Sequence, residues 1–177
     1  MKLFLKYIGE FLRTYPQIRF TRNDEILIRE SVMKHLGLDN LNQLRDRYEG
    51  QAFFEKTMMN VGGLISIQKH LNLPIVDFTT INLKDFQPKI NLNGDLVDVH
   101  VFEFGSLPLI NIDNIKRPVF FVIKKDHITF TICGLATKDV VRENLERTHI
   151  EKSSTVNNMS FIGFKHLKHI DTVAVNK

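Results

Sequence analysis

The stretch FQPKINLNGDLVDVHVF, which runs from Phe86 to Phe102, places Asn93-Gly94 between two runs that favour β-strands. Asn-Gly in this setting is the strongest short-range signal for a β-hairpin, because both central residues of the turn need a positive φ. We therefore predict that residues 86–102 form an antiparallel hairpin that turns at Asn93-Gly94.

The two-residue turn also fixes which side chains face each other. Counting outward from the turn, Lys89 lies opposite Asp98, and Gln87 lies opposite His100. Side chains two residues apart on a strand point to the same side of the sheet. We therefore expect these four polar side chains to share one face of the hairpin.

The rest of the second half also favours strands. The apolar runs 118–123 and 128–133 are separated by the polar residues 124–127, which predicts a second hairpin. Thr137 precedes a helical pattern over residues 138–145 and is a typical N-cap residue.

The first half favours helices. Apolar residues at three-and-four spacing predict a helix over residues 3–15, which Pro16 closes. A second helix is expected to begin near Asn23 or Asp24, as the N-cap, and to end at Gly37. A third is expected from residue 39 onward, and the pair Gly62-Gly63 is expected to break or bend it.

This order of elements defines a fold class. Helices followed by two hairpins and a helix indicate an α/β protein in an α+β arrangement, with a helical N-terminal half packed on a mixed sheet. Regular βαβ alternation is absent, which disfavours the parallel-sheet nucleotide-binding folds. The chain has 177 residues, so we expect residues 1–177 to form one domain.

Composition narrows the function classes. Lys and Arg exceed Asp and Glu by 24 to 20, a mild basic excess that is compatible with a polyanionic partner. The single cysteine, Cys133, excludes an internal disulfide and a paired-cysteine zinc motif, and its apolar setting predicts a buried, inert thiol. No apolar run reaches the length of a membrane span, and we expect a cytoplasmic protein.

Several common catalytic motifs are missing from the sequence. It contains no phosphate-binding loop, dinucleotide-binding glycine motif, nucleophile elbow or His-Glu-x-x-His zinc motif. His166 and His169 stand three residues apart and would form a metal-binding pair on a helix, although a basic solvated face is the simpler interpretation.

The first hairpin resembles the core of the PD-(D/E)xK superfamily, the restriction-endonuclease-like nucleases. Pro88-Lys89 falls on the family's Pro-Asp, and Asp98-Val99-His100 falls on its Asp/Glu-x-Lys. Lys89 and His100 depart from the pattern, so Asp98 alone matches in chemical type. A weaker similarity extends over about residues 45–145 and includes the second hairpin and the helix after it.

The resemblance implies a restriction-endonuclease-like domain in which two acids hold Mg²⁺ and a lysine helps to activate water for phosphodiester hydrolysis. The positions that it marks for catalysis are Asp98, His100, Asp85 and Lys89. The positions that it marks for Mg²⁺ are Asp98, Asp85 and Glu49.

The second acid is the open question in this set. Asp85 is on the same strand face as Lys89 but about 13 Å further along the strand, which is too far to share a metal with Asp98 without a bulge. Glu30, Glu49 or Glu55, from the preceding helices, are other sources of a ligand. A cross-strand ion pair between Lys89 and Asp98 explains both residues without any metal.

Three functions remain open from the sequence. The first is a DNA-acting or DNA-binding protein of the PD-(D/E)xK nuclease type, with Mg²⁺ as its cofactor if it is active. The second is a catalytically inactive nuclease-fold module for DNA or protein interaction, which the substitutions at Lys89 and His100 favour. The third is an unrelated α+β structural protein. DNA is the expected partner, and a homodimer is compatible with the sequence.

Overall fold

The computed structural model of the chain describes residues 1–40, 43, 48–77, 86–147 and 157–173. In these ranges the α-helices are α1 (Lys2–Ile8), α2 (Arg22–Leu36), α4 (Tyr48–His70) and α5 (Lys138–Glu143). The strands are β1 (Gln17–Arg19), β2 (Lys89–Leu92), β3 (Asp95–Glu103), β4 (Leu109–Asn111), β5 (Val119–Lys124), β6 (Thr129–Ala136), β7 (Leu145–Glu146) and β8 (Asn158–Phe161). The 3₁₀ turns are η2 (Ile112–Asn114), η4 (Phe164–His166) and η5 (Ile170–Thr172).

The strands form two sheets. The larger sheet is mixed and has the order β1-β6-β5-β3-β2, whereas the smaller is antiparallel and has the order β4-β8-β7. Both predicted hairpins are confirmed, as β2–β3 and β5–β6. The two hairpins join side by side because β3 and β5 run parallel, and the chain passes through β4 and η2 between them.

The β2–β3 hairpin has the predicted turn and register. Asn93 and Gly94 have φ values of 56° and 95°, the left-handed conformation that this turn requires. Lys89 is paired with Asp98, as the count from the turn predicts. The Gly94 amide donates a hydrogen bond to the side-chain oxygen of Asn91 at 2.9 Å, which ties the turn to β2.

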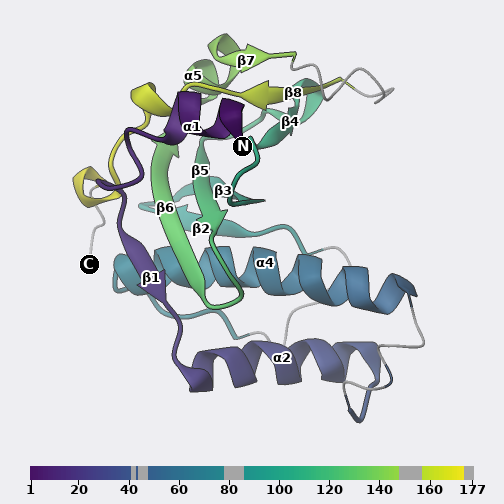
Figure 1. Cartoon of the computed structure of the whole chain (residues 1–177). Helices are drawn as coiled ribbons and strands as arrows, with labels where there is room; N and C mark the ends of the chain where they lie inside the picture. The colour runs from purple at the N-terminus through teal and green to yellow at the C-terminus, as the bar shows by residue number, and fades with distance from the viewer. Residues whose placement is uncertain (41–42, 44–47, 78–85, 148–156, 174–177) are drawn as a thin grey trace.

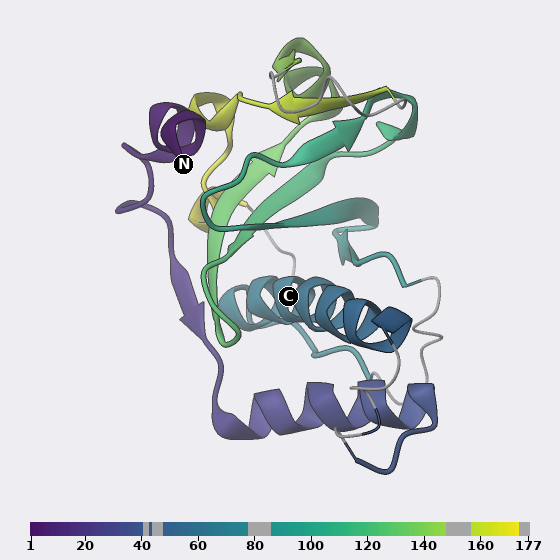
Figure 2. The same cartoon turned by 45° about the vertical axis from the view of Figure 1, so that its right-hand side comes forward.

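The larger sheet is covered on both faces (Figures 1 and 2). Helix α4 lies against one face with α2 beyond it, and α1, α5 and the smaller sheet lie at the other. On β3, Val97, Val99 and Val101 belong to the core on the α4 side, and Phe102 belongs to the core opposite. Covering both faces explains why five consecutive residues of β5, from 119 to 123, are buried.

Helix α4 runs without interruption through Gly62 and Gly63, so the predicted break at this pair is wrong. A Cβ atom on Gly62 would lie 2.3 Å from the Phe130 ring, and one on Gly63 would lie 2.2 Å from a Val101 methyl carbon. The two glycines therefore let the helix backbone approach the sheet closely. Packing, and not a turn, accounts for them.

Three helix boundaries also bear on the sequence predictions. Helix α1 ends at Ile8, well short of the predicted residue 15, and is followed by turns. Helix α2 begins two or three residues earlier than predicted, because Thr21 is its N-cap and Asp24 completes a capping box from the third position. The predicted cap at Thr137 is confirmed, since its side chain accepts a hydrogen bond from the Val140 amide.

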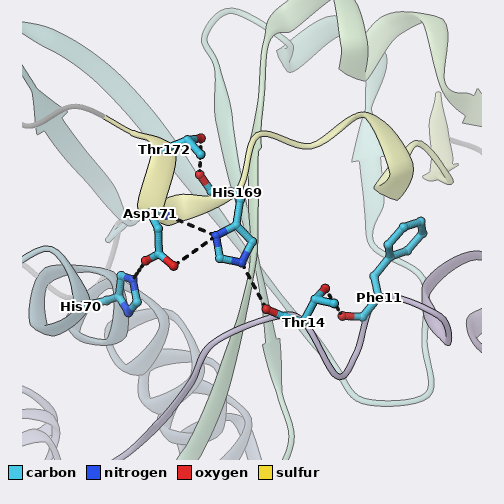
Figure 3. A network of polar contacts seen from close by, with 6 residues as sticks. All are labelled: Phe11, Thr14, His70, His169, Asp171 and Thr172. Carbon is cyan, nitrogen blue, oxygen red and sulfur yellow. Dashed lines mark hydrogen bonds and ion pairs between the residues drawn. The ribbon is translucent and has the colours of Figure 1, made fainter.

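A polar network fastens the C-terminal segment to the rest of the fold (Figure 3). The Asp171 carboxylate contacts His70 of α4 at 2.6 Å and His169 at 3.3 Å. The other ring nitrogen of His169 lies 3.1 Å from the Thr14 carbonyl oxygen. No helix in the described part of the chain is long and apolar enough to cross a membrane.

Candidate functional site

A cleft of about 800 Å³ opens beside the β2–β3 hairpin. One wall comes from Lys56, Met59 and Asn60 of α4, which occupy one face of the helix at three-and-four spacing. The other walls come from the start of β2, the middle of β3, and the segment from β4 to the start of β5. The cleft therefore lies where the helix layer, the larger sheet and the smaller sheet meet.

The hairpin exposes β3 to this cleft because its two strands differ in length. Strand β2 begins at Lys89, opposite Asp98, whereas β3 continues to Glu103. The backbone amide of Val99 still donates to the Pro88 carbonyl at 2.9 Å, and β3 then extends past β2. Residues 98–101 of β3 line the cleft.

Three of the predicted site residues meet here. Lys89, Asp98 and His100 all line the cleft, and Asp98 and His100 are two residues apart on the same face of β3. Gln87, predicted opposite His100, lines it as well. All four side chains therefore line one cleft, but β2 begins at Lys89, so the predicted pairing of Gln87 with His100 is not part of the strand ladder.

The cleft is predominantly basic. Of the described residues that line it, the four cationic ones are Lys56, Lys89, Lys116 and Arg117, and the one anionic residue is Asp98. Lys56 and Lys116 are exposed, while Lys89 and Arg117 are half-buried. A cleft with several cations and one carboxylate attracts anions.

The cross-strand ion pair expected between Lys89 and Asp98 is not among the ion pairs of the described residues. Asp98 instead has Arg117 as its cationic neighbour, with 3.6 Å between the guanidinium nitrogen Nη1 and Oδ1. That distance is longer than a hydrogen bond. Oδ1 is buried and has no hydrogen-bond partner in the described part of the chain.

His100 is the second polar group of β3 in the cleft. Burial lowers the pKa of His100 to about 4, so its ring is neutral at neutral pH. The ring meets the Phe121 ring edge-on, with 5.9 Å between the centroids. A neutral imidazole offers one hydrogen-bond donor and one acceptor, which is unlike the lysine that the nuclease pattern has at this position.

The predicted second acid is not found in the described cleft. Asp85 lies outside the described residues, and for Glu49 the structure describes only the backbone, in the first turn of α4. Glu49 precedes Lys56 by seven residues, or about 10 Å along the same helix face. Glu30 and Glu55 are exposed and do not line the cleft.

These residues do not make a Mg²⁺ site by themselves. Mg²⁺ binds oxygen ligands, usually with one or two carboxylates, whereas the described cleft offers one carboxylate beside Lys89 and Arg117. No group of three or more His, Cys, Asp or Glu side chains among the described residues is arranged to hold a metal ion.

The second metal site considered from the sequence, the pair His166 and His169, is not supported by the structure. Helix η4 ends at His166, so His166 and His169 are not on one helix. His166 is exposed, and His169 is engaged by Thr14 and Asp171. Cys133 is buried as predicted, and burial raises the pKa of its thiol well above the usual value.

From the sequence, Lys116 and Arg117 were possible phosphate contacts, but they were not placed beside the hairpin. Arg117 comes two residues before Val119, which pairs with Asp98 through the parallel contact between β3 and β5. No local pattern in the sequence predicts that pairing. Lys56 and Asn60 carry a detectable signal, four-residue spacing on a helix, but nothing in their spacing says that this face meets the hairpin.

Comparisons with models of protein families, with curated proteins and with solved structures give no match for this chain. The function must therefore be argued from the cleft itself.

Proposed function

We propose that this protein binds DNA and that the cleft beside the β2–β3 hairpin holds the phosphate backbone. The observation that carries the proposal is the cleft lining, in which four cations outnumber one carboxylate. The sequence resemblance of the hairpin to the PD-(D/E)xK nucleases supports the same class of partner. On this view the protein is a relative of those enzymes that keeps the binding cleft and has an altered metal-binding pattern.

The three lysines of the cleft have no ion-pair partner among the described residues, whereas Arg117 is the neighbour of Asp98. Two other lysines of the described structure have ion-pair partners within the fold: Lys69 pairs with Asp24, and Lys124 pairs with Glu103. No such ion pair is found for Lys56, Lys89 or Lys116 among the described residues. Lysine side chains gathered in one concave site are a common means of holding phosphates.

The dependence of affinity on salt tests this proposal. Each phosphate that the protein neutralises releases condensed counterions, so four contacts predict a log–log slope of about 3 on single strands and just under 4 on duplex. The measurement is fluorescence anisotropy of labelled oligonucleotides over a range of salt concentrations. Undetectable binding at low salt, or an affinity that salt does not change, would contradict the proposal.

A metal-dependent nuclease is the second candidate. The observation that favours it is the Asp98 carboxylate, which lines a cleft built on a nuclease-like hairpin and whose oxygen Oδ1 has no hydrogen-bond partner in the described structure. Its further ligand would come from the chain outside the described side chains, where Asp85 and Glu49 are the sequence candidates.

A nicking assay on supercoiled plasmid with Mg²⁺ or Mn²⁺ separates the two candidates. A nuclease predicts cleavage that Asp98→Asn abolishes while the fold is retained, because an amide keeps the shape of the side chain but loses its charge. We expect the natural protein to bind DNA without cleaving it. Turnover that depends on Asp98 would make the protein an enzyme.

A further inference from the structure

The cleft continues the line of β2 along the edge of β3. The ladder between the two strands ends with the pair Lys89 and Asp98, and one more bond joins the Val99 amide to the Pro88 carbonyl. Residues 98–101 of β3 line the cleft, and they include side chains from both faces of the strand. A space that meets both faces of a strand lies at its edge. The cleft is therefore where a further length of β2 would run beside β3.

The size of the cleft restricts what enters it. Helix α4 bounds the cleft on one side, and the segment from β4 to the start of β5 bounds it on the other. Its volume of about 800 Å³ is in the range of pockets that enclose one small molecule. A nucleotide is a ligand of that size, whereas a turn of duplex, with two strands of stacked bases, is many times larger. The interior of the cleft therefore has room for a single strand and not for a duplex.

The four cations of the cleft lie at two levels. The inner pair is Lys89 and Arg117, which are half-buried, and the rim pair is Lys56 and Lys116, which are exposed. The Arg117 nitrogen Nη1 lies 3.6 Å from the buried Asp98 Oδ1, so the guanidinium is inside the cleft. The Arg117 side chain is still 38% exposed, so a ligand that enters the cleft reaches it. Lys89 is placed at the same level, because it lies opposite Asp98 across the hairpin.

Duplex and single-stranded DNA meet these two levels differently. A duplex is stiff, with a persistence length of about 150 base pairs, so it does not bend into a cleft of this size. It lies across the mouth of the cleft and meets the rim pair. A single strand is flexible, and basic grooves in proteins commonly follow the backbone of an unpaired strand. A strand that enters the cleft meets the inner pair as well as the rim pair.

The rest of the lining indicates how the strand is held. No Phe, Tyr or Trp side chain lines the cleft in the described part of the chain, so stacking of bases on such rings does not contribute. Asn60, Asn111 and Asn158 instead supply side-chain amides, which donate hydrogen bonds to phosphate and sugar oxygens. Contacts to the backbone carry no sequence information, so we expect no preference for a particular base.

We infer that the cleft takes single-stranded DNA, whose backbone reaches the inner pair, and that a duplex reaches only the rim pair. This inference rests on the proposed DNA-binding function and adds the form of DNA that the protein prefers. The salt dependence of binding distinguishes the two modes. A duplex held by two contacts should give a log–log slope of about 2, in place of the just under 4 that four contacts give, whereas a single strand with four contacts gives about 3.

The test compares the affinities of short labelled oligo(dT) and of a blunt-ended duplex of the same length, by fluorescence anisotropy at low salt. Two further charged contacts predict that the single strand binds the wild-type protein about tenfold more tightly, or better. Lys89→Gln with Arg117→Gln removes the inner pair and should bring the ratio of the two affinities close to one. The matched control, Lys56→Gln with Lys116→Gln, removes the same charge from the rim. It should weaken the binding of both forms without lowering the ratio.

The outcomes separate this inference from the proposed function. Equal affinity of the wild-type protein for both forms, or tighter binding of the duplex, overturns the inference while DNA binding stands, and this comparison needs no variant to fold. A wild-type ratio that persists in the inner-pair variant also overturns it, because the preference would then come from elsewhere. Absence of binding to either form overturns both the inference and the proposed function.

Discussion

His100 occupies a position that protonation would disturb. Its ring lies between the cleft and Phe121, and burial lowers its pKa to about 4, compared with an ordinary value near 6.5. The folded protein therefore holds the neutral ring over a pH range in which the unfolded chain would bind a proton. Between these two pKa values, folding excludes that proton.

Stability should fall as the pH is lowered through this range. The contribution of His100 is fully present above pH 6.5, and it is lost as the pH falls from about 6.5 to about 4, where the loss reaches at most about 3 kcal/mol. Denaturant unfolding of the wild type and of His100→Gln at neutral and acidic pH measures it. The variant should lose less stability on acidification, and an identical loss in both proteins would show that His100 is not the group involved.

Single residues also show how much of the candidate site can be predicted from the sequence. Lys89, Asp98 and His100 were predicted to share one face because a two-residue turn fixes the hairpin register, and all three line the cleft. The ion pair between Lys89 and Asp98 was not predictable in the same way. That pair is not found, and the cationic neighbour of Asp98 is Arg117, which approaches it from the segment before β5.

At the scale of elements, α4 joins the helical half of the protein to the larger sheet. It packs on β3 through Gly63 and on β6 through Gly62, while its other surroundings include α2. The close approach brings Lys56, Met59 and Asn60 to the edge of the cleft. The glycine pair thus helps to set the width of the site as well as the core packing.

Replacing Gly63 by alanine should therefore destabilise the protein, although alanine is the better helix former by about 1 kcal/mol. The added methyl would overlap Val101 in a packed core, and such overpacking costs roughly 1–3 kcal/mol. Denaturant unfolding gives the change in free energy. Combining Gly63→Ala with Val101→Ala should recover part of the loss, and a Gly63→Ala protein more stable than the wild type would refute the packing account.

Elements governed by local chemistry were predictable, and those governed by distant contacts were not. Asn93-Gly94 and Thr137 act on their immediate neighbours, so the hairpin and the cap follow from the sequence. Gly62-Gly63 has the composition of a helix break, but its structural role depends on Phe130 and Val101, which lie far along the chain. The parallel pairing of β3 with β5 is of the same distant kind.

For the whole molecule, the distribution of charge matters more than its total. The net charge of +4 is modest and does not identify a partner. The fold gathers four of its cations around one cleft, drawing them from α4, β2 and the segment before β5. A basic cleft thereby arises from residues that are scattered from position 56 to position 117.

The most direct test of this account compares two double variants that remove the same charge from different places. Lys89→Gln with Arg117→Gln acts in the cleft, and Arg19→Gln with Lys125→Gln acts on exposed residues of β1, at the opposite edge of the sheet, and of the β5–β6 turn. We predict that the first pair weakens binding of single-stranded DNA at least tenfold, as expected for two lost charged contacts, while the second stays within about twofold of the wild type. Equal losses in both pairs, or none in the cleft pair, would contradict the assignment of DNA binding to the cleft.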